Sequence, residues 1–427
     1  MTDTDAGTGS TADDLVAAGA ALAEIFLTPE GYADPYSRYA VLHERAPVVP
    51  GGEGGLVLAR YDDCQAVLRD NRLGKDFDPA RGVPGASMSD PEVVAFRQRV
   101  AEQQADRPLS MLAANPPDHT RIRGLVSRAF TPRRVERLRE HIVELADERF
   151  DRMAELGSFD LLEELGFPLP VSVIGELVGV PRADWPRFRQ LVTTTAASLE
   201  FTSSLAELEA AEVAGQEMWD YFEHLVAEKR RHRADDLLSA MIEASDQGDQ
   251  LSEGEAIIQA MLMFAAGFET TTNVIGNGVV ALLQRPAEQH RLWADPDLVP
   301  SAVEEMLRFD SPVQLDARSV FEPVEVAGVE LEAGARVVTL LGAANRDPSR
   351  FSDPDRFDVG RDEGPPLSFA SGIHYCLGAN LARAEVQVVL AGLIRRFSHI
   401  ELTGELVHRN RITLRGYRAV PVRVTPR

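Results

Sequence analysis

The sequence predicts one mainly α-helical domain with minor β-sheets, spanning residues 1–427. Amphipathic helical patterns recur along the chain, stretches with strand character are short, and no low-complexity linker, repeat or shift in composition marks a domain boundary. With 44% hydrophobic residues, a chain of this length can bury a sizeable core. The acidic and polar beginning does not fit this pattern, and we expect residues 1–20 to form a flexible segment.

Composition narrows the possible classes of function. A net charge of −23 argues against nucleic acid as a partner. The N-terminus lacks the basic and apolar regions of a signal peptide, and no apolar run approaches the roughly 20 residues of a membrane span. Two cysteines, Cys64 and Cys376, cannot build a disulfide framework. We therefore expect a cytoplasmic protein that neither binds nucleic acid nor enters a membrane.

The secondary-structure elements follow from local patterns. Residues 133–156 place apolar side chains on one face of a helix, and residues 205–244 read similarly. The Pro/Gly-rich segment 79–88 and the region 197–206 are expected to be loops or short helices, which either cover a site or simply connect elements at the surface. Three short stretches with strand character are expected to form the sheets: 54–61, 324–341 and 419–425.

The longest predicted helix runs from residue 252 to residue 285. Ser252 and Glu255 have the spacing of a capping box, and Pro286 marks the end. At 1.5 Å per residue this helix would be about 51 Å long, so we expect it to cross the whole molecule. Its apolar residues fall on nearly every side, which indicates a buried helix.

The same helix contains the irregular stretch AAGFETTT. Ala265, Ala266 and Gly267 remove side-chain bulk over a full turn. Glu269 and threonines 270–272 then place an acid and hydroxyls in an apolar helix. One interpretation is a packing notch, in which a threonine hydroxyl bonds back to the helix carbonyls. The other is a groove where a flat ligand approaches the backbone and a hydroxyl–carboxylate pair moves protons.

Cys376 lies in the stretch FASGIHYCLG, two residues after His374 and just before a strongly helical pattern. A helix N-terminus offers free amides and the positive end of the helix dipole, which stabilise a thiolate. Gly372 and Gly378 allow the loop to turn and a bulky group to approach. A thiolate held in such a loop beside a flat partner is typical of axial ligation of haem iron.

This stretch resembles the cysteine-ligand loop of the cytochrome P-450 superfamily, although Ala370 stands where the family commonly has glycine. AGFETT is similar to the family's oxygen-activating stretch, and EEMLR supplies its Glu-x-x-Arg. ANRDP followed by FSDPDRFD resembles the segment that brings a further arginine to that pair. NPPDHTRIRGLVSRAFTPRRV resembles the helix that crosses the haem. Each match alone could be an ordinary helix pair or a solvated face, but together and in the family's order these matches identify the chain as resembling this family over nearly its whole length.

The resemblance implies the cytochrome P-450 fold, with the long central helix crossing over haem b. Cys376 would be the axial ligand of the haem iron. The remaining residues of its loop that match the family are Phe369, Gly372, His374 and Gly378. The residues implied to bind the haem propionates are His119, Arg123, Arg318 and His374.

The resemblance also implies roles away from the cysteine loop. Ala266 and Gly267 would open the groove for dioxygen, and Glu269 with Thr270 would relay protons there. A further set would hold the scaffold without taking part in catalysis: Glu305, Arg308 and Arg356.

These residues favour a soluble bacterial monooxygenase that inserts one oxygen atom from dioxygen into an apolar small molecule, such as a polyketide, terpenoid, steroid or fatty acid. Electrons would come from NAD(P)H through a soluble ferredoxin and its reductase. One alternative is a peroxygenase, but such members of the family carry arginine in place of the acid that is Glu269 here. A non-catalytic haem-binding protein is the other alternative, and it would not need both Glu269 and Thr270 in an apolar helix.

The resemblance also indicates where the two partners would bind. A ferredoxin would meet residues 121–140, which hold seven arginines against two glutamates, unless these charges form only a solvated helix face. Five segments are expected to line the substrate pocket: 75–111, 190–210, Met263 with Phe264, 312–315 and 412–414.

Overall fold

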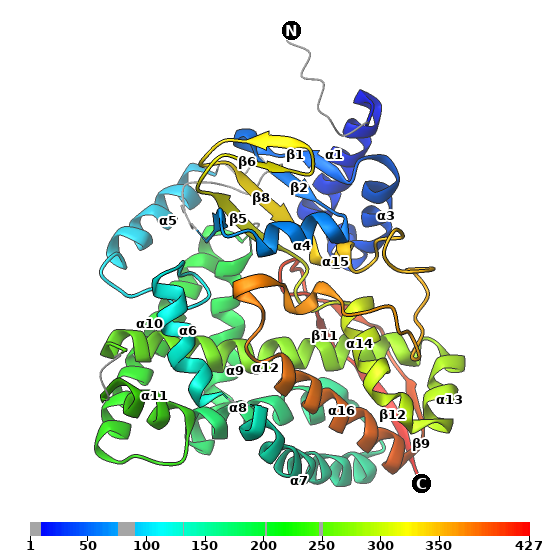
Figure 1. The fold of residues 1–427 in the computed structure, drawn as a ribbon. Coiled ribbons are helices and arrows are strands. Elements are labelled where there is room, and N and C mark those ends of the chain that lie inside the picture. The colour runs from blue at the N-terminus through cyan, green and yellow to red at the C-terminus, as the bar shows by residue number, and fades with distance from the viewer. Residues whose placement is uncertain (1–9, 76–89, 131, 201–202, 247–250) are drawn as a thin grey trace.

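The computed structural model describes residues 10–75, 90–130, 132–200, 203–246 and 251–427. In Figure 1 one part of the molecule holds the largest sheet together with the first helices of the chain, and the other part is helical. The first helix, α1 (Ala12–Leu27), and the C-terminal end of the chain lie on opposite sides of the molecule. This arrangement confirms the expected mainly α fold with minor sheets.

Helices make up most of the structure, and each takes its bounds from local capping and from the face that it buries. The α-helices are α1 (Ala12–Leu27), α2 (Pro29–Ala33), α3 (Tyr36–Arg45), α4 (Tyr61–Arg69), α5 (Pro91–Gln103), α6 (Asp118–Ala129), α7 (Pro132–Leu156), α8 (Pro168–Val178), α9 (Trp185–Thr195), α10 (Leu205–Arg231), α11 (Leu237–Asp246), α12 (Glu253–Leu283), α13 (Pro286–Ala294), α14 (Val299–Phe309), α15 (Leu341–Ala344) and α16 (Ala379–Arg396).

The strands are short and come mostly from the two ends of the chain. They are β1 (Val48–Pro50), β2 (Leu56–Leu58), β3 (Leu73–Gly74), β4 (Ser158–Asp160), β5 (Asp316–Val320), β6 (Val324–Val326), β7 (Val329–Leu331), β8 (Arg336–Thr339), β9 (Phe397–Leu402), β10 (Val407–His408), β11 (Tyr417–Ala419) and β12 (Pro421–Pro426).

The largest sheet has the strand order β1-β2-β8-β5-β3. Its pairs are antiparallel except for β2 with β8, which are parallel. The edge strand β3 pairs with β5, so that Gly74 lies opposite Ser319. The sheet therefore brings residue 75, near the start of the chain, next to residues 316–320 from its last third.

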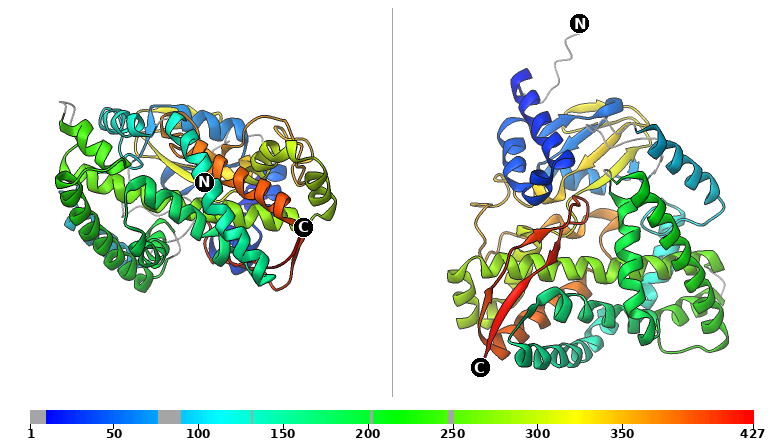
Figure 2. Two further views of the ribbon diagram at one scale, coloured as in Figure 1. Left: turned by 90° about the horizontal axis from the view of Figure 1, so that it is seen from below. Right: turned by 180° about the vertical axis from the view of Figure 1, so that it is seen from behind.

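The long helix forms as the sequence predicts. Ser252 accepts a hydrogen bond from the amide of Glu255, and the Glu255 carboxylate accepts one from the amide of Ser252, which completes the capping box. Most residues of α12 are buried, because α8, α10, α14 and α16 pack around it. Both Figure 1 and the rear view in Figure 2 show α12 crossing the helical part of the molecule.

The expectation of a flexible segment over residues 1–20 is wrong for residues 12–20, which belong to α1. Thr11 and Asp14 form a capping box at its N-terminus. Ala18, Leu22 and Ile25 lie on one face of the helix and are buried against α3 and the sheet. Spacing of three and four residues between apolar positions was the signal for this helix. Residues 1–9 lie outside the described residues.

The helical pattern over residues 205–244 also needs correction, because the structure divides it into α10 and α11. The break leads into Asp236, which accepts a hydrogen bond from the Ser239 amide at 2.7 Å and so begins the second helix. Of the two expected loops, 79–88 lies outside the described residues, while a single helical turn covers 196–199 before α10 begins. Within the described ranges, no helix is both long and apolar enough to cross a membrane.

Candidate functional site

The loop before α16 holds Cys376 with its side chain exposed. Its amide donates to the carbonyl of Phe369 at 3.0 Å, which closes the loop. Gly372 has a φ of +70°, and a β-carbon there would lie 2.2 Å from the Leu68 carbonyl oxygen. Glycine is therefore required at 372 because the backbone of α4 approaches so closely. Ala370 has a φ of +56°, which is strained for alanine and explains why glycine suits this position.

The surroundings of Cys376 have two opposing effects on the pKa of its thiol. The protein packed around the sulfur raises the pKa of Cys376, although the residue is accessible to solvent. The amides of Gly378 and Ala379, at the beginning of α16, act in the opposite direction, as does Arg123. Arg123 also donates to the carbonyl of Tyr375 at 2.5 Å, which ties α6 to the cysteine loop.

The middle of α12 is accessible at one point of an otherwise buried helix. Ala266 is exposed, and the Thr270 hydroxyl beside it donates to the Ala266 carbonyl at 2.8 Å. Gly267 fits the packing notch of the first interpretation, because a β-carbon there would lie 2.6 Å from Ile174 of α8. The structure therefore combines both interpretations of this stretch: Gly267 is a packing notch, whereas Ala266 and Thr270 border open space.

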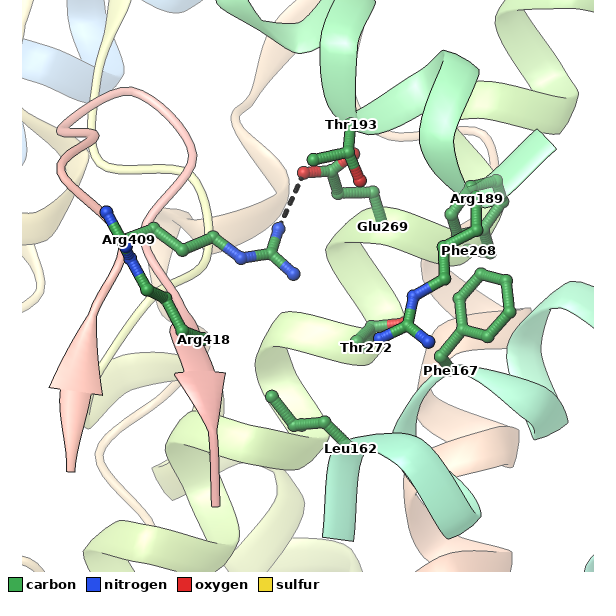
Figure 3. Close-up of a pocket in the computed structure, with 9 residues that line it drawn as sticks. All are labelled: Leu162, Phe167, Arg189, Thr193, Phe268, Glu269, Thr272, Arg409 and Arg418. Atoms are coloured by element: carbon green, nitrogen blue, oxygen red, sulfur yellow. Dashed lines mark hydrogen bonds and ion pairs between the residues drawn. The ribbon is translucent and has the colours of Figure 1, made fainter. Parts of the chain in front are cut away.

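Glu269 lies on the other side of the same turn, at a polar pocket (Figure 3). Arg409 reaches from the β10–β11 hairpin and donates to Glu269 Oε1 at 2.9 Å. The second carboxylate oxygen and the Thr272 hydroxyl are buried and have no hydrogen-bond partner in the described part of the chain. Burial raises the pKa of Glu269, and Arg409 opposes this change. The other residues that line the pocket are Leu162, Phe167, Arg189, Thr193, Phe268 and Arg418.

A second group of buried polar side chains, the His119 cluster, consists of His119, Arg318 and His374. The rings of His119 and His374 have centroids 4.4 Å apart. Burial lowers the pKa of both histidines, to about 3 for His374, so both are neutral near pH 7. Both ring nitrogens of His119, Nε2 of His374 and Nη2 of Arg318 are buried, and none has a hydrogen-bond partner among the described residues.

Buried donors without acceptors are costly unless a ligand supplies the acceptors. The two propionates of haem b carry negative charge and accept hydrogen bonds, which matches this set of donors. The thiol of Cys376 follows His374 by two residues and offers the single sulfur ligand that haem iron takes in a haem-thiolate protein. The residues present therefore fit haem b.

A third group, the Glu305 cluster, consists of Glu305, Arg308 and Arg361. Arg308 donates to both oxygens of Glu305 at 2.6 and 2.9 Å, and to the carbonyls of Asn345 and Pro354 at 2.9 Å each. Arg361 Nε lies 3.2 Å from Glu305 Oε2. All three side chains are buried.

The expectation that Arg356 joins this pair is wrong. Its side chain is 59% exposed, and the nearest acidic oxygen, on Asp358, lies 3.8 Å away. The reason is the backbone: the Arg356 carbonyl turns inward and accepts from Arg308 at 3.2 Å and from Arg361 at 2.9 Å, so its side chain turns outward. Arg361, five residues later, takes the inward position.

Some residues of the expected pocket segments are held inside the protein, and others are exposed. Phe264 is fully buried and packs against Phe188 and Phe222, so its ring belongs to the helical core. The backbone of residues 412–414 is fixed in place, since the buried carboxylate of Glu200 accepts hydrogen bonds from all three amides. Leu109 and Leu199, in two other expected segments, are exposed by 60% and 46%. Part of the segment 75–111 lies outside the described residues.

Sequence reasoning missed several polar residues that the fold brings to these places. Arg409 and Arg361 carry no local motif. Lys75 reaches Asp316 and Arg318 only because β3 pairs with β5. The one available signal was the spacing of Asp316 and Arg318. Residues two apart in a strand share a face, so an acid was to be expected next to that arginine.

Comparison with known proteins agrees with these observations. Residues 88–414 match the family model described as Cytochrome P450. Cytochrome P450 107B1 of Saccharopolyspora erythraea is 39% identical over 398 residues, which cover 91% of this chain and 95% of that protein. The 6-deoxyerythronolide B hydroxylase of the same organism is 36% identical over 406 residues, covering 92% of this chain and 96% of that protein.

Solved structures show the same similarity in three dimensions. The crystal structure of the myxobacterial cytochrome P450 CYP267B1, in complex with myristic acid, aligns with a TM-score of 0.83 at 38% sequence identity. The alignment covers 94% of this chain and 99% of that one.

Proposed function

The chain belongs to the cytochrome P450 family of haem-binding monooxygenases, and we propose that it uses electrons from a ferredoxin to insert one oxygen atom from dioxygen into an apolar small molecule. One observation carries the proposal: the exposed thiol of Cys376 lies two residues after His374, which belongs to a group of buried donors without acceptors among the described residues. A structural cysteine would be buried, as Cys64 is.

Haem b, when bound, supplies the reductive activation of dioxygen and the transfer of one of its atoms. The chain's own residues would hold and orient this group. Cys376 would provide the thiolate, kept reactive by the amides of Gly378 and Ala379. His119 and His374 would each donate a ring N–H to a propionate, and Arg318 would do so from Nη2.

Proton supply would fall to Glu269 and Thr270 on α12. Glu269 borders the polar pocket, and burial raises the pKa of its carboxyl, which favours a group that can hold a proton more readily than an exposed glutamate. The unpartnered Thr272 hydroxyl and the guanidinium of Arg409 offer further polar groups along this pocket. Thr270 lies one residue on, beside the exposed Ala266, where its hydroxyl would hand the proton onward.

The central experiment compares the two cysteines. Cys376→Ser should abolish the strongly red-shifted Soret band that thiolate ligation gives to the reduced carbon-monoxide complex, whereas Cys64→Ser should keep it. Cys64 is a matched control because its thiol is buried and donates only to the Leu58 carbonyl, at 3.4 Å. If Cys376→Ser retained the band, the ligand would be misassigned. Consumption of NADPH with a surrogate ferredoxin system would then separate the monooxygenase from a peroxygenase or a haem carrier.

The substrate is proposed to be an apolar molecule such as a polyketide, terpenoid, steroid or fatty acid. Two observations support this: relatives include a 6-deoxyerythronolide B hydroxylase and a structure with myristic acid, and the exposed Leu109 and Leu199 lie in segments expected to line the pocket. A spectral screen for compounds that convert the haem from its water-ligated form would identify the class. Selective response to strongly charged compounds would contradict the proposal.

The ferredoxin is proposed to bind the arginine-rich segment 121–140, in a protein of the cytoplasm. Two of its arginines already have partners, since Arg121 contacts Glu255 and Arg139 contacts Glu136. Arg133 and Arg134, whose side chains lie outside the described residues, are proposed to steer an acidic partner.

Changing Arg133 and Arg134 together to Glu should slow ferredoxin-driven reduction and weaken its dependence on salt. The matched control is Arg149→Glu with Arg152→Glu, which makes the same change of charge further along α7. Stopped-flow reduction across a series of ionic strengths is the measurement. Equal effects of the two pairs would mean that overall charge, and no local patch, sets the rate.

A further inference from the structure

One buried cation near the His119 cluster has no part in the function described so far. Lys75 is 7% exposed and follows directly on β3. Its ammonium contacts Asp316 Oδ1 and lies 3.3 Å from the carbonyl oxygen of Ala317. A buried lysine is costly, so its retention beside a proposed cofactor site calls for an explanation.

Strand pairing explains how Lys75 reaches this place. Gly74 lies opposite Ser319, so one further step of the antiparallel register brings Lys75 opposite Arg318. Two cations in directly opposed positions repel each other. Asp316 shares a face with Arg318 and stands between the two cations, with Oδ2 lying 2.6 Å from Arg318 Nη1 and Oδ1 in contact with Lys75.

The backbone of Lys75 is fixed to the element that carries His119. Asn115 accepts from the Lys75 amide at 2.7 Å and donates to the Lys75 carbonyl at 2.5 Å. The carbonyl of Asn115 accepts from the His119 amide at 2.8 Å, at the beginning of α6. A β-carbon on Gly74 would lie 2.4 Å from Asn115 Oδ1, so glycine is needed for this approach. Lys75 and His119 are thereby held in one rigid arrangement.

The charges of this group do not cancel. Burial acts against ionisation of Asp316, but Lys75 and Arg318 hold the pKa of Asp316 well below its ordinary value, so the carboxylate is ionised. Among the described residues, one anion stands between two cations, so Lys75, Asp316 and Arg318 together carry a single positive charge. Without Lys75, Asp316 and Arg318 would form a neutral pair, and Nη2 of Arg318, which has no hydrogen-bond partner among the described residues, would belong to that pair.

We propose that Lys75 is a positioning residue for haem: by engaging one oxygen of Asp316, it leaves Arg318 with an uncompensated charge for a propionate. This inference rests on the proposed haem-thiolate function. It predicts that the charge of Lys75 and the charge of Asp316 have opposite effects on the bound haem.

The test uses purified holoenzyme and two measurements that do not depend on turnover: the rate of haem transfer to an excess of an apo-globin, and the midpoint potential of the haem iron. Lys75→Met should speed haem transfer by roughly tenfold, because one partly buried unit charge is removed. It should also lower the potential, since a nearby positive charge favours the ferrous state. Lys75→Arg should restore both values toward wild type.

Asp316→Asn should shift the potential upward, and the double variant Lys75→Met with Asp316→Asn should return it toward the wild-type value. A merely structural ion pair would behave differently: either single change would speed haem transfer, and the potential would not move in opposite directions. That result would overturn the inference while the thiolate Soret band persisted. Loss of the band in wild-type protein would instead overturn the proposed function itself.

Discussion

The Glu305 cluster and the His119 cluster are both built around a buried arginine, but only the first gives that arginine acceptors for all its nitrogens. At the edge of the Glu305 cluster, Nε of Arg361 has no hydrogen-bond partner among the described residues. Arg308 has acceptors for each of its nitrogens, in Glu305 and in three backbone carbonyls. In the His119 cluster, Arg318 Nη2 and three imidazole nitrogens have no partner among the described residues. A closed network stabilises the fold, whereas an open one costs stability until a ligand completes it.

The largest loss of stability is expected when the Glu305 cluster is disrupted. Arg308→Ala would leave Glu305 buried without its main partner and the carbonyls of Asn345 and Pro354 without this donor, while the Arg356 carbonyl would keep only Arg361. Breaking a buried ion pair in this way costs about 3–5 kcal/mol. Urea unfolding of the variant should show this loss, and poor accumulation of folded protein would agree with it. A loss below about 1 kcal/mol would mean that the two clusters do not differ as described.

A substitution in the His119 cluster is expected to cause no loss of stability in the haem-free protein. His119→Phe removes two unpartnered nitrogens and keeps the aromatic volume, so the haem-free protein should be as stable as wild type or about 1 kcal/mol more stable. Haem transfer to an apo-globin should be roughly tenfold faster, because a charge-assisted hydrogen bond to the haem is lost. Unfolding of the haem-free protein and haem transfer are measured on the same preparation. Destabilisation of the haem-free protein would show that His119 serves the fold.

A smaller effect is expected from the edge of the closed cluster. Arg361→Ala should cost about 1 kcal/mol, because its Nε lies near Glu305 but the main pairing is with Arg308. Arg356→Ala, the matched control from the same segment, should change the free energy of unfolding by less than about 0.5 kcal/mol, since its side chain is mostly exposed. If the two variants were equally destabilised, the assignment of the inward position to Arg361 would fail.

The smallest effect on stability is expected on α12, where two neighbouring threonines make the same hydrogen bond on different sides. Thr270 donates to Ala266 beside open space, and Thr271 donates to Gly267 with its side chain buried. Thr270→Ala should leave NADPH consumption largely intact but divert it to hydrogen peroxide, because proton delivery is disturbed. Thr271→Val should keep product formed per NADPH near the wild-type value. Equal losses in both variants would point to helix distortion instead.

How far the sequence predicted the site depends on whether a residue lies within a local motif. The cysteine loop and the capped helix 252–285 were predicted because their signals lie within a few residues of one another. Arg356 was misplaced because a motif does not say which way a backbone turns. For Gly267 the sequence left two interpretations open, because the approach of Ile174 depends on how α8 packs. Arg409 was missed since its ion pair with Glu269 joins residues 140 positions apart.

The sequence by itself therefore determined the fold class, the position of Cys376 at the beginning of a helix, and the acid and hydroxyls in the middle of α12. These depend on periodicity, capping and turn chemistry, which act over one or two turns of chain. Tertiary structure alone decided which polar groups are satisfied: that Arg308 finds its acceptors, that His119 finds none among the described residues, and that Lys75 meets Asp316. The physical reason is that burial and pairing depend on segments that only folding brings together. Whether a buried donor stabilises or destabilises the fold depends mostly on whether one of these segments supplies its acceptor.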